Sequence, residues 1–144
     1  MMKQNQQLLS AMLKTIQSSQ TEIRSIMDTT LGSSLRNTLE SQLQEYDAME
    51  TEAFTIALQR GWELPELDPG RRFLKDRVTR MKIIKDRNTD SRIADILIQG
   101  NTKGMIRGLK HLHQFEVQDH PIRILSQKLL DCETAHIRQM QSFL

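Results

Sequence analysis

With 144 residues, 26% of them charged, and a net charge of +2, the chain has the size of one domain with a buried core. This charge balance argues against a protein dedicated to nucleic-acid binding. Good helix formers dominate and aromatic residues make up only 4%, so we predict an all-α protein with one domain over residues 1–144. The single cysteine, Cys132, favours a reducing compartment, and we expect a cytoplasmic location. No apolar run reaches about 18 residues, so we expect no membrane insertion.

Two long helices are predicted within the first sixty residues. Apolar side chains at alternating steps of three and four form one seam over residues 5–28 and a second seam over residues 34–60. Gly32 lies in the short turn between them, which predicts antiparallel neighbours. The second helix has an acidic outer face. It is predicted to end at Gly61, with Trp62 folding back onto the apolar seam.

Residues 71–87 are strongly basic, with Leu74, Val78, Met81 and Ile84 on one helical face. The pattern predicts a short amphipathic basic helix. Such a helix can bind an anionic membrane surface or a nucleic-acid backbone, which would make the protein a regulator. However, the acidic face of the preceding helix nearly cancels its charge. We therefore expect the basic helix to pack against the bundle and to bind no nucleic acid.

Three glycines, Gly100, Gly104 and Gly108, recur every fourth residue and share one stripe of a helix. Each costs about 0.8–1 kcal/mol relative to Ala in a helix interior. We predict one unbroken helix over residues 90–114, with another helix pressed against the bare face. The alternative is a break, in which Gly100 ends one helix and Thr102 caps the next.

The last predicted helix runs from Pro121 to the C-terminus, with Asp119 or His120 beside its cap position. Four helices of similar length predict a four-helix bundle. The connection over residues 61–89 is long enough to cross the length of the bundle, which leaves the third helix parallel to the second. One long crossover of this kind is typical of the ferritin-like bundle, and here it would carry the short basic helix.

Three short segments resemble known protein families. Gly61-Trp-Glu-Leu-Pro65 resembles the end of the first helical hairpin in spore coat F-like proteins, and residues 93–104 resemble the glycine-bearing third helix of that group. Residues 129–140 are similar to the last helix of ferritin-like proteins. The resemblance implies a ferritin-like bundle with a role in sporulation, located in the cytoplasm or the spore coat. It implies a non-catalytic assembly protein with protein partners, including self-association into a dimer.

One motif has the spacing of metal ligands. In Glu133-Thr-Ala-His136, a carboxylate and an imidazole lie on adjacent turns of one helix face. A ferritin-like di-metal site needs two such pairs and one Glu from each of the other two helices. Glu22 and Glu40 are predicted near the level of this motif, but Leu43 stands where the second His is required.

Two interpretations follow from this incomplete ligand set. In the simpler one, Glu133 is partly exposed, His136 is hydrogen-bonded, and the protein has no cofactor and no catalytic residue. In the alternative, iron or manganese is held by Glu22, Glu40, Glu133 and His136 in a carboxylate-bridged bundle with an oxidoreductase or iron-handling role. Cys132 lies on an apolar helix face and is expected to act as a small hydrophobe.

Overall fold

A computed structural model describes residues 2–29, 31–65, 89–115 and 119–144, and these residues form four α-helices. The helices are α1 (Met2–Met27), α2 (Ser33–Arg60), α4 (Thr89–Gln114) and α5 (His120–Gln141). The prediction of an all-α protein with four long helices is therefore confirmed for the described ranges. The basic helix predicted over residues 71–87 lies outside them.

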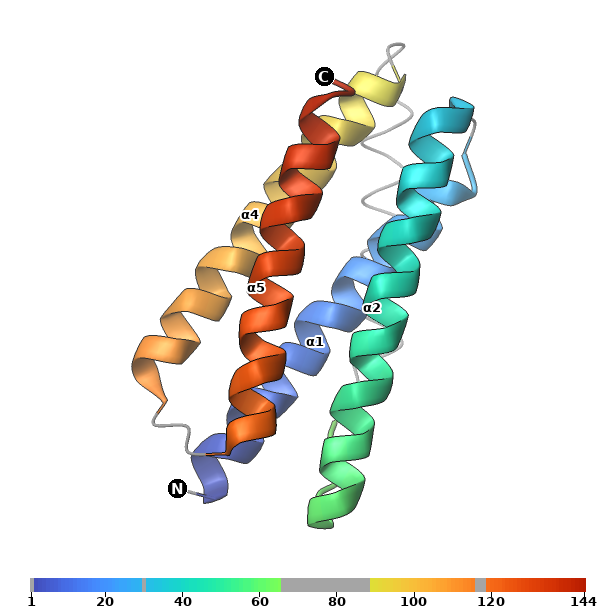
Figure 1. Cartoon of the computed structure of the whole chain (residues 1–144). Helices are drawn as coiled ribbons and strands as arrows, with labels where there is room; N and C mark the ends of the chain where they lie inside the picture. The colour runs from blue at the N-terminus through green and yellow to red at the C-terminus, as the bar shows by residue number, and fades with distance from the viewer. Residues whose placement is uncertain (1, 30, 66–88, 116–118) are drawn as a thin grey trace.

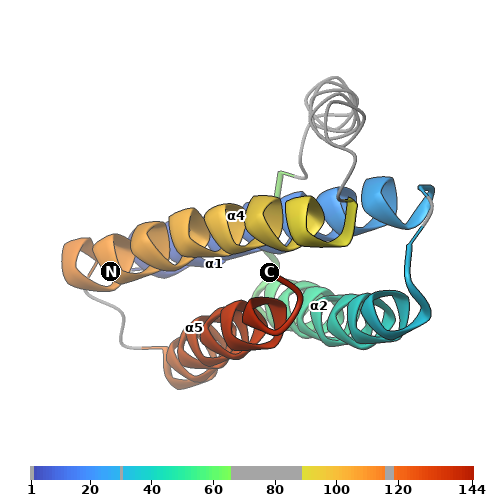
Figure 2. The ribbon, with the colours of Figure 1, turned by 90° about the horizontal axis from the view of Figure 1, so that it is seen from above.

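The helices form two layers, with α1 and α4 in one layer and α2 and α5 in the other (Figure 2). Helix α1 runs antiparallel to α2, and α4 runs antiparallel to α5 (Figure 1). Helices α2 and α4 point in the same direction, as predicted for the third helix (Figure 1). The two layers contact each other mainly through the pairs α1–α2 and α4–α5, and also through α1–α5.

The apolar seams predicted from the three- and four-residue spacing form the core. From α1, Leu9, Ile16 and Ile26 are completely buried, and Leu35 and Leu39 of α2 are buried against them. Helices α4 and α5 add further apolar residues to the same core: Ile93, Ala94, Leu97, Ile122, Leu125, Leu129 and Met140. Burial of these seams is the main term that holds the helices together, because most of the stability of a helix in a protein comes from packing of its apolar face.

Helix α2 ends as the sequence predicts. Gly61 has a left-handed backbone with φ of 68°, a conformation that costs other residues more than glycine. The Trp62 amide donates to the Ala57 carbonyl at 2.9 Å, and the indole packs against the core. The Arg60 guanidinium lies 5.9 Å from the centre of the Trp62 ring, within the range of a cation–π contact.

The start of α5 is tied to the end of α2 by one side chain. Asp119 is the N-cap of α5, and its carboxylate accepts a hydrogen bond from the Ile122 amide. The same carboxylate pairs with both Nε and Nη2 of Arg60, the latter at 2.8 Å. Two separate helix ends are therefore held in register by one partly buried ion pair.

The glycine stripe lies within one continuous helix, as predicted, and the alternative of a break at Gly100 does not occur. A Cβ added to these glycines would meet side chains of neighbouring helices at 2.7 Å (Gly100 and Glu22), 2.8 Å (Gly104 and Glu133) and 3.0 Å (Gly108 and Leu130). The close packing predicted for the bare face is confirmed. Two of the three side chains that fill it are carboxylates.

No helix in the described part of the chain is both long and apolar enough to span a bilayer.

Candidate functional site

Polar side chains from several helices meet inside the bundle. The Tyr46 hydroxyl on α2 donates to Oδ1 of Asn101 on α4, at 3.3 Å. Nδ1 of His136 on α5 lies 3.2 Å from the Tyr46 oxygen, and the two rings meet edge to face with their centres 5.1 Å apart. Tyr46 and His136 are both completely buried. The Ser19 hydroxyl of α1 adds a further hydrogen bond to Tyr46.

The groups that contact the two ring nitrogens of His136 indicate which nitrogen carries the proton. Burial raises the pKa of Tyr46 well above its usual value, so the phenol keeps its proton. The phenol oxygen lies within hydrogen-bond distance of two acceptor atoms, Oδ1 of Asn101 and Nδ1 of His136. Burial also lowers the pKa of His136, although Glu45 opposes that shift. Because the Glu45 carboxylate contacts Nε2 and can only accept, the neutral imidazole carries its proton on Nε2 and donates it to Glu45.

Two further donor groups lie on the Nε2 side of the ring. Cys132 Sγ is 3.3 Å from His136 Nε2 and 3.3 Å from Glu45 Oε2, and Glu45 Oε2 also contacts Nε2 directly. All three ligand atoms lie within 4.8 Å of one another. We call this group the Glu45–Cys132–His136 cluster. The Glu45 side chain is 50% exposed whereas His136 is fully enclosed, so the cluster opens to solvent on the carboxylate side.

Helix geometry explains how the cluster forms. Cys132 and His136 are four residues apart on α5, so their side chains lie one above the other on the same face. Glu45 directly precedes Tyr46 on α2. Tyr46 points into the core, and its neighbour is rotated by about 100° around the helix axis toward α5. The two helices pack against each other, which brings the carboxylate to the thiol.

The cluster is not arranged as a nucleophile with its base. In such a triad the thiol and the carboxylate face opposite ring nitrogens, so that the carboxylate orients the base. Here both groups face Nε2 of His136. Burial, followed by the contact with Glu45, raises the pKa of the Cys132 thiol, whereas a nucleophilic cysteine needs a lowered pKa. Three donor atoms this close together could instead share one metal ion.

Glu133 corrects one expectation from the sequence. It was expected to be partly exposed, but only 1% of its surface is accessible. Within the described part of the chain, neither carboxyl oxygen has a hydrogen-bond partner. Burial raises the pKa of Glu133 to about 8, and the positive charge of Arg107 acts in the opposite direction. The carboxyl points at Gly104, and this bare backbone is what makes room for it.

The four residues predicted as metal ligands lie in different environments. His136 belongs to the cluster, while Glu133 faces the glycine stripe. Glu22 is half-buried beside Gly100, and Glu40 is exposed. Among the described residues, the Glu45–Cys132–His136 cluster is the one group with at least three ligand atoms close enough to share an ion. Of the four predicted metal ligands, it contains only His136. Binding by the predicted set stays a prediction.

Sequence reasoning missed two members of the cluster. The four-residue spacing of Cys132 and His136 is a usable signal, because it places a thiol and an imidazole on one helix face. Cys132 was instead interpreted as a small hydrophobe. Glu45 carries no such signal, since it lies 87 positions from Cys132 and belongs to an acidic face that resembles an ordinary solvated surface.

Comparisons with protein-family models, with curated proteins and with solved structures find no match to this chain.

Proposed function

We propose that the protein binds one divalent metal ion of the zinc type at the Glu45–Cys132–His136 cluster. The observation that carries the proposal is the convergence of a thiol, an imidazole and a carboxylate from two helices, with their ligand atoms within 4.8 Å of one another. Each of these groups is a common zinc ligand.

The separations of the donor atoms suit a small tetrahedral ion. Bond lengths of 2.0–2.3 Å to zinc place ligands on neighbouring corners roughly 3.4 Å apart. The Cys132 sulfur lies 3.3 Å from each of the other two donors. The direct contact between Glu45 and His136 is the one that an ion would replace. A soft thiolate favours zinc over manganese or magnesium, which prefer oxygen ligands.

The protonation states are compatible with this role. His136 is neutral, and an ion at Nε2 requires the tautomer with its proton on Nδ1, where the Tyr46 oxygen can accept it. The Cys132 thiol is protonated without an ion, and a bound cation would displace that proton. Because Glu45 is half exposed, a fourth position remains open to a solvent molecule. Such an ion would be exchangeable, which is compatible with metal handling.

The test is a competition titration with zinc, together with the spectrum of the cobalt-substituted protein. We expect one equivalent of zinc per chain, and a cobalt spectrum with a thiolate-to-metal charge-transfer band. Cys132→Ser should abolish that band and weaken zinc binding by more than about 100-fold. Tyr46→Phe, which removes the hydroxyl that contacts His136 but none of the three donors, should weaken it by about 10–100-fold.

Glu40→Gln is the matched control for Glu45→Gln, since both replace a carboxylate of α2 but Glu40 lies outside the cluster. Glu40→Gln should leave the affinity for zinc unchanged, while Glu45→Gln should lower it. Binding of less than a stoichiometric amount of zinc, or a cobalt spectrum without the thiolate band, would show that the three donors do not bind an ion.

We also propose the role implied by the sequence resemblance, a ferritin-like bundle that acts as a non-catalytic assembly protein related to the spore coat. The parallel course of α2 and α4 supports the ferritin-like connection (Figure 1). Ile106 and Leu109 support an interaction role, because they lie three positions apart on α4 and are 45% and 43% exposed. Two neighbouring exposed apolar side chains are suited to the centre of a contact.

Sedimentation of the full chain tests the assembly role. The expected result is a concentration-dependent dimer that the double variant Ile106→Asn/Leu109→Asn converts to a monomer. Leu58→Asn is the control, because Leu58 is 82% exposed and lies on α2. If the chain sediments as a monomer at all concentrations, or if the double variant leaves a dimer intact, Ile106 and Leu109 do not support an assembly role.

A further inference from the structure

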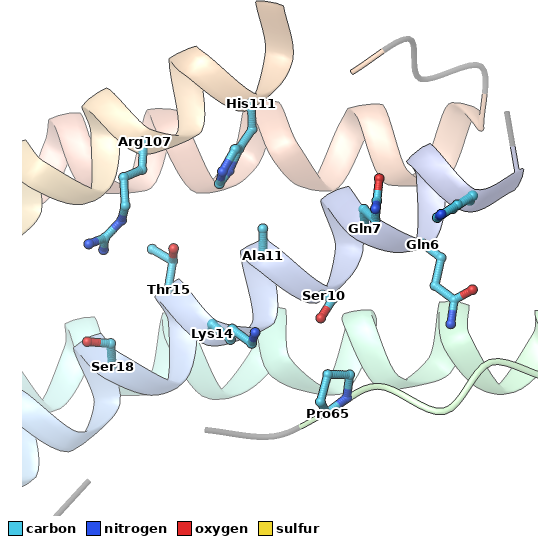
Figure 3. A pocket seen from close by; sticks show the side chains of 11 residues that line it. Gln6, Gln7, Ser10, Ala11, Lys14, Thr15, Ser18, Pro65, Arg107 and His111 are labelled. Carbon is cyan, nitrogen blue, oxygen red and sulfur yellow. The ribbon is translucent and has the colours of Figure 1, made fainter. Parts of the chain in front are cut away.

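A groove of about 730 Å³ runs along the outer side of the layer formed by α1 and α4. Figure 3 shows its walls: Ser10, Lys14 and Ser18 come from α1, while Arg107 and His111 come from α4. Pro65, just after the end of α2, lies at its lower edge in this view (Figure 3). Ligand sites commonly have volumes of about 300–1,000 Å³, so the groove is large enough for a specific ligand.

The charged side chains that line the described part of the groove are all positive. Lys3, Lys14 and Arg107 line it, and its described lining includes no carboxylate. Within the described ranges none of these three cations forms an ion pair, whereas other basic residues, such as Arg24 and Lys128, pair with acidic residues of α2. Arg107 lies one turn before His111 on α4, and its positive charge helps burial to lower the pKa of that imidazole. An anionic ligand would complement this field.

The remaining lining groups are suited to a polypeptide backbone. Gln6 and Gln7 offer amides, and Ser10 offers a hydroxyl, so each can both donate and accept hydrogen bonds. The imidazole of His111 is the one aromatic ring among the described lining residues. Stacking of several successive bases, the usual means of holding single-stranded nucleic acid, therefore has no platform here.

The distance between the basic side chains of the groove favours an extended ligand. Lys3 and Lys14 are eleven positions apart on α1, which corresponds to about 16 Å along the helix axis. A single phosphate group can contact one end of such a groove only. An extended peptide rises about 3.3 Å per residue, so about five residues span the distance.

We propose that this groove binds an extended, acidic segment of a partner polypeptide. Carboxylates of the segment pair with Lys3, Lys14 and Arg107, and its peptide groups hydrogen-bond with the amides and hydroxyls of α1. This binding is separate from the Glu45–Cys132–His136 cluster, which lies between α2 and α5.

The experiment measures fluorescence anisotropy of a labelled hexaglutamate peptide mixed with the full chain, near physiological ionic strength. We expect saturable binding at a single site and a shift of the His111 ring resonances. Each exposed ion pair contributes about 0.5–1 kcal/mol, so the double variant Lys14→Gln/Arg107→Gln should bind about five- to thirtyfold more weakly. Both side chains are exposed, so the fold should be retained.

The matched control is Lys103→Gln/Arg123→Gln, which removes the same two charge types from exposed positions outside the groove. It should change the affinity by less than about twofold. Equal losses in the two double variants would mean that hexaglutamate responds only to net charge, including that of the basic residues 71–87, and would overturn the proposal. Absence of saturable binding would also overturn it. Inorganic pyrophosphate that binds the groove as tightly as the peptide would assign it to small anions instead.

Discussion

Replacement of Glu133 by Gln should stabilise the protein at pH 8.5 by on the order of 2–4 kcal/mol. The reason is the burial of the carboxyl group, whose oxygens have no hydrogen-bond partner among the described residues. Its pKa in the folded protein is about 8, against an ordinary value of 4.5. Between these two values the unfolded chain has lost a proton that the folded chain still holds. Stability therefore falls as the pH rises through this range, and glutamine, which is neutral, removes that loss.

Urea denaturation at several pH values between 5 and 8.5 measures this effect, with a chelator present to keep metal from the adjacent Cys132. The difference between the variant and the native chain should be small near pH 5 and grow steadily toward pH 8.5. Glu40→Gln is the control, since it makes the same chemical change at an exposed position and should produce no such trend. If the two variants follow parallel curves, Glu133 is ionised in the folded protein at neutral pH and the interpretation of its burial is wrong.

The helices and their ends could be predicted because their causes are local. The spacing of apolar residues predicts the buried seams of α1 and α2, including Leu9, Ile16 and Leu39. Gly61 provides the left-handed residue at the end of α2, and Asp119 the cap of α5. Each of these signals acts within about one or two turns, so no knowledge of the partner helix is required.

The glycine stripe could be predicted only in part from the sequence. Three glycines in one helix predict a close approach, and the structure has one. The pattern does not tell which side chains fill the space. Carboxylates occupy it at Gly100 and Gly104, and a buried carboxylate is the less common choice because it loses its hydration. The expectation of a partly exposed Glu133 failed for this reason.

Only part of the Glu45–Cys132–His136 cluster could be predicted from the sequence, because the rest depends on how two helices pack. Cys132 and His136 share a face of one helix, and their spacing alone predicts that they meet. Glu45 reaches them through the packing of α2 on α5, which a single sequence does not encode in any short motif. A ligand set shared between helices therefore depends on their relative rotation and height. An error of one residue turns a side chain by about 100° around the axis.

Replacement of Gly104 by Leu should destabilise the fold by about 1–3 kcal/mol or more. A Cβ at this position would already lie 2.8 Å and 3.1 Å from the two oxygens of Glu133, closer than van der Waals contact allows. The enclosed cavity beside these two residues measures only about 10 Å³, which is roughly the space of one water-sized probe. Neither the leucine side chain nor a displaced carboxyl group has room there. Thermal and urea denaturation measure the loss.

The alanine variants show whether contact with Glu133 is the cause. On an exposed helix surface Gly→Ala stabilises by about 0.4–1 kcal/mol, because the unfolded chain loses conformational freedom. Gly104→Ala should instead be neutral or destabilising in the native chain, since its methyl group meets the carboxyl group. In a Glu133→Ala background the same change should stabilise, because the obstructing group is gone. A double-mutant cycle over the two positions isolates this coupling. Equal effects of Gly104→Ala in both backgrounds would mean that the bare face of α4 serves something other than the buried carboxyl group.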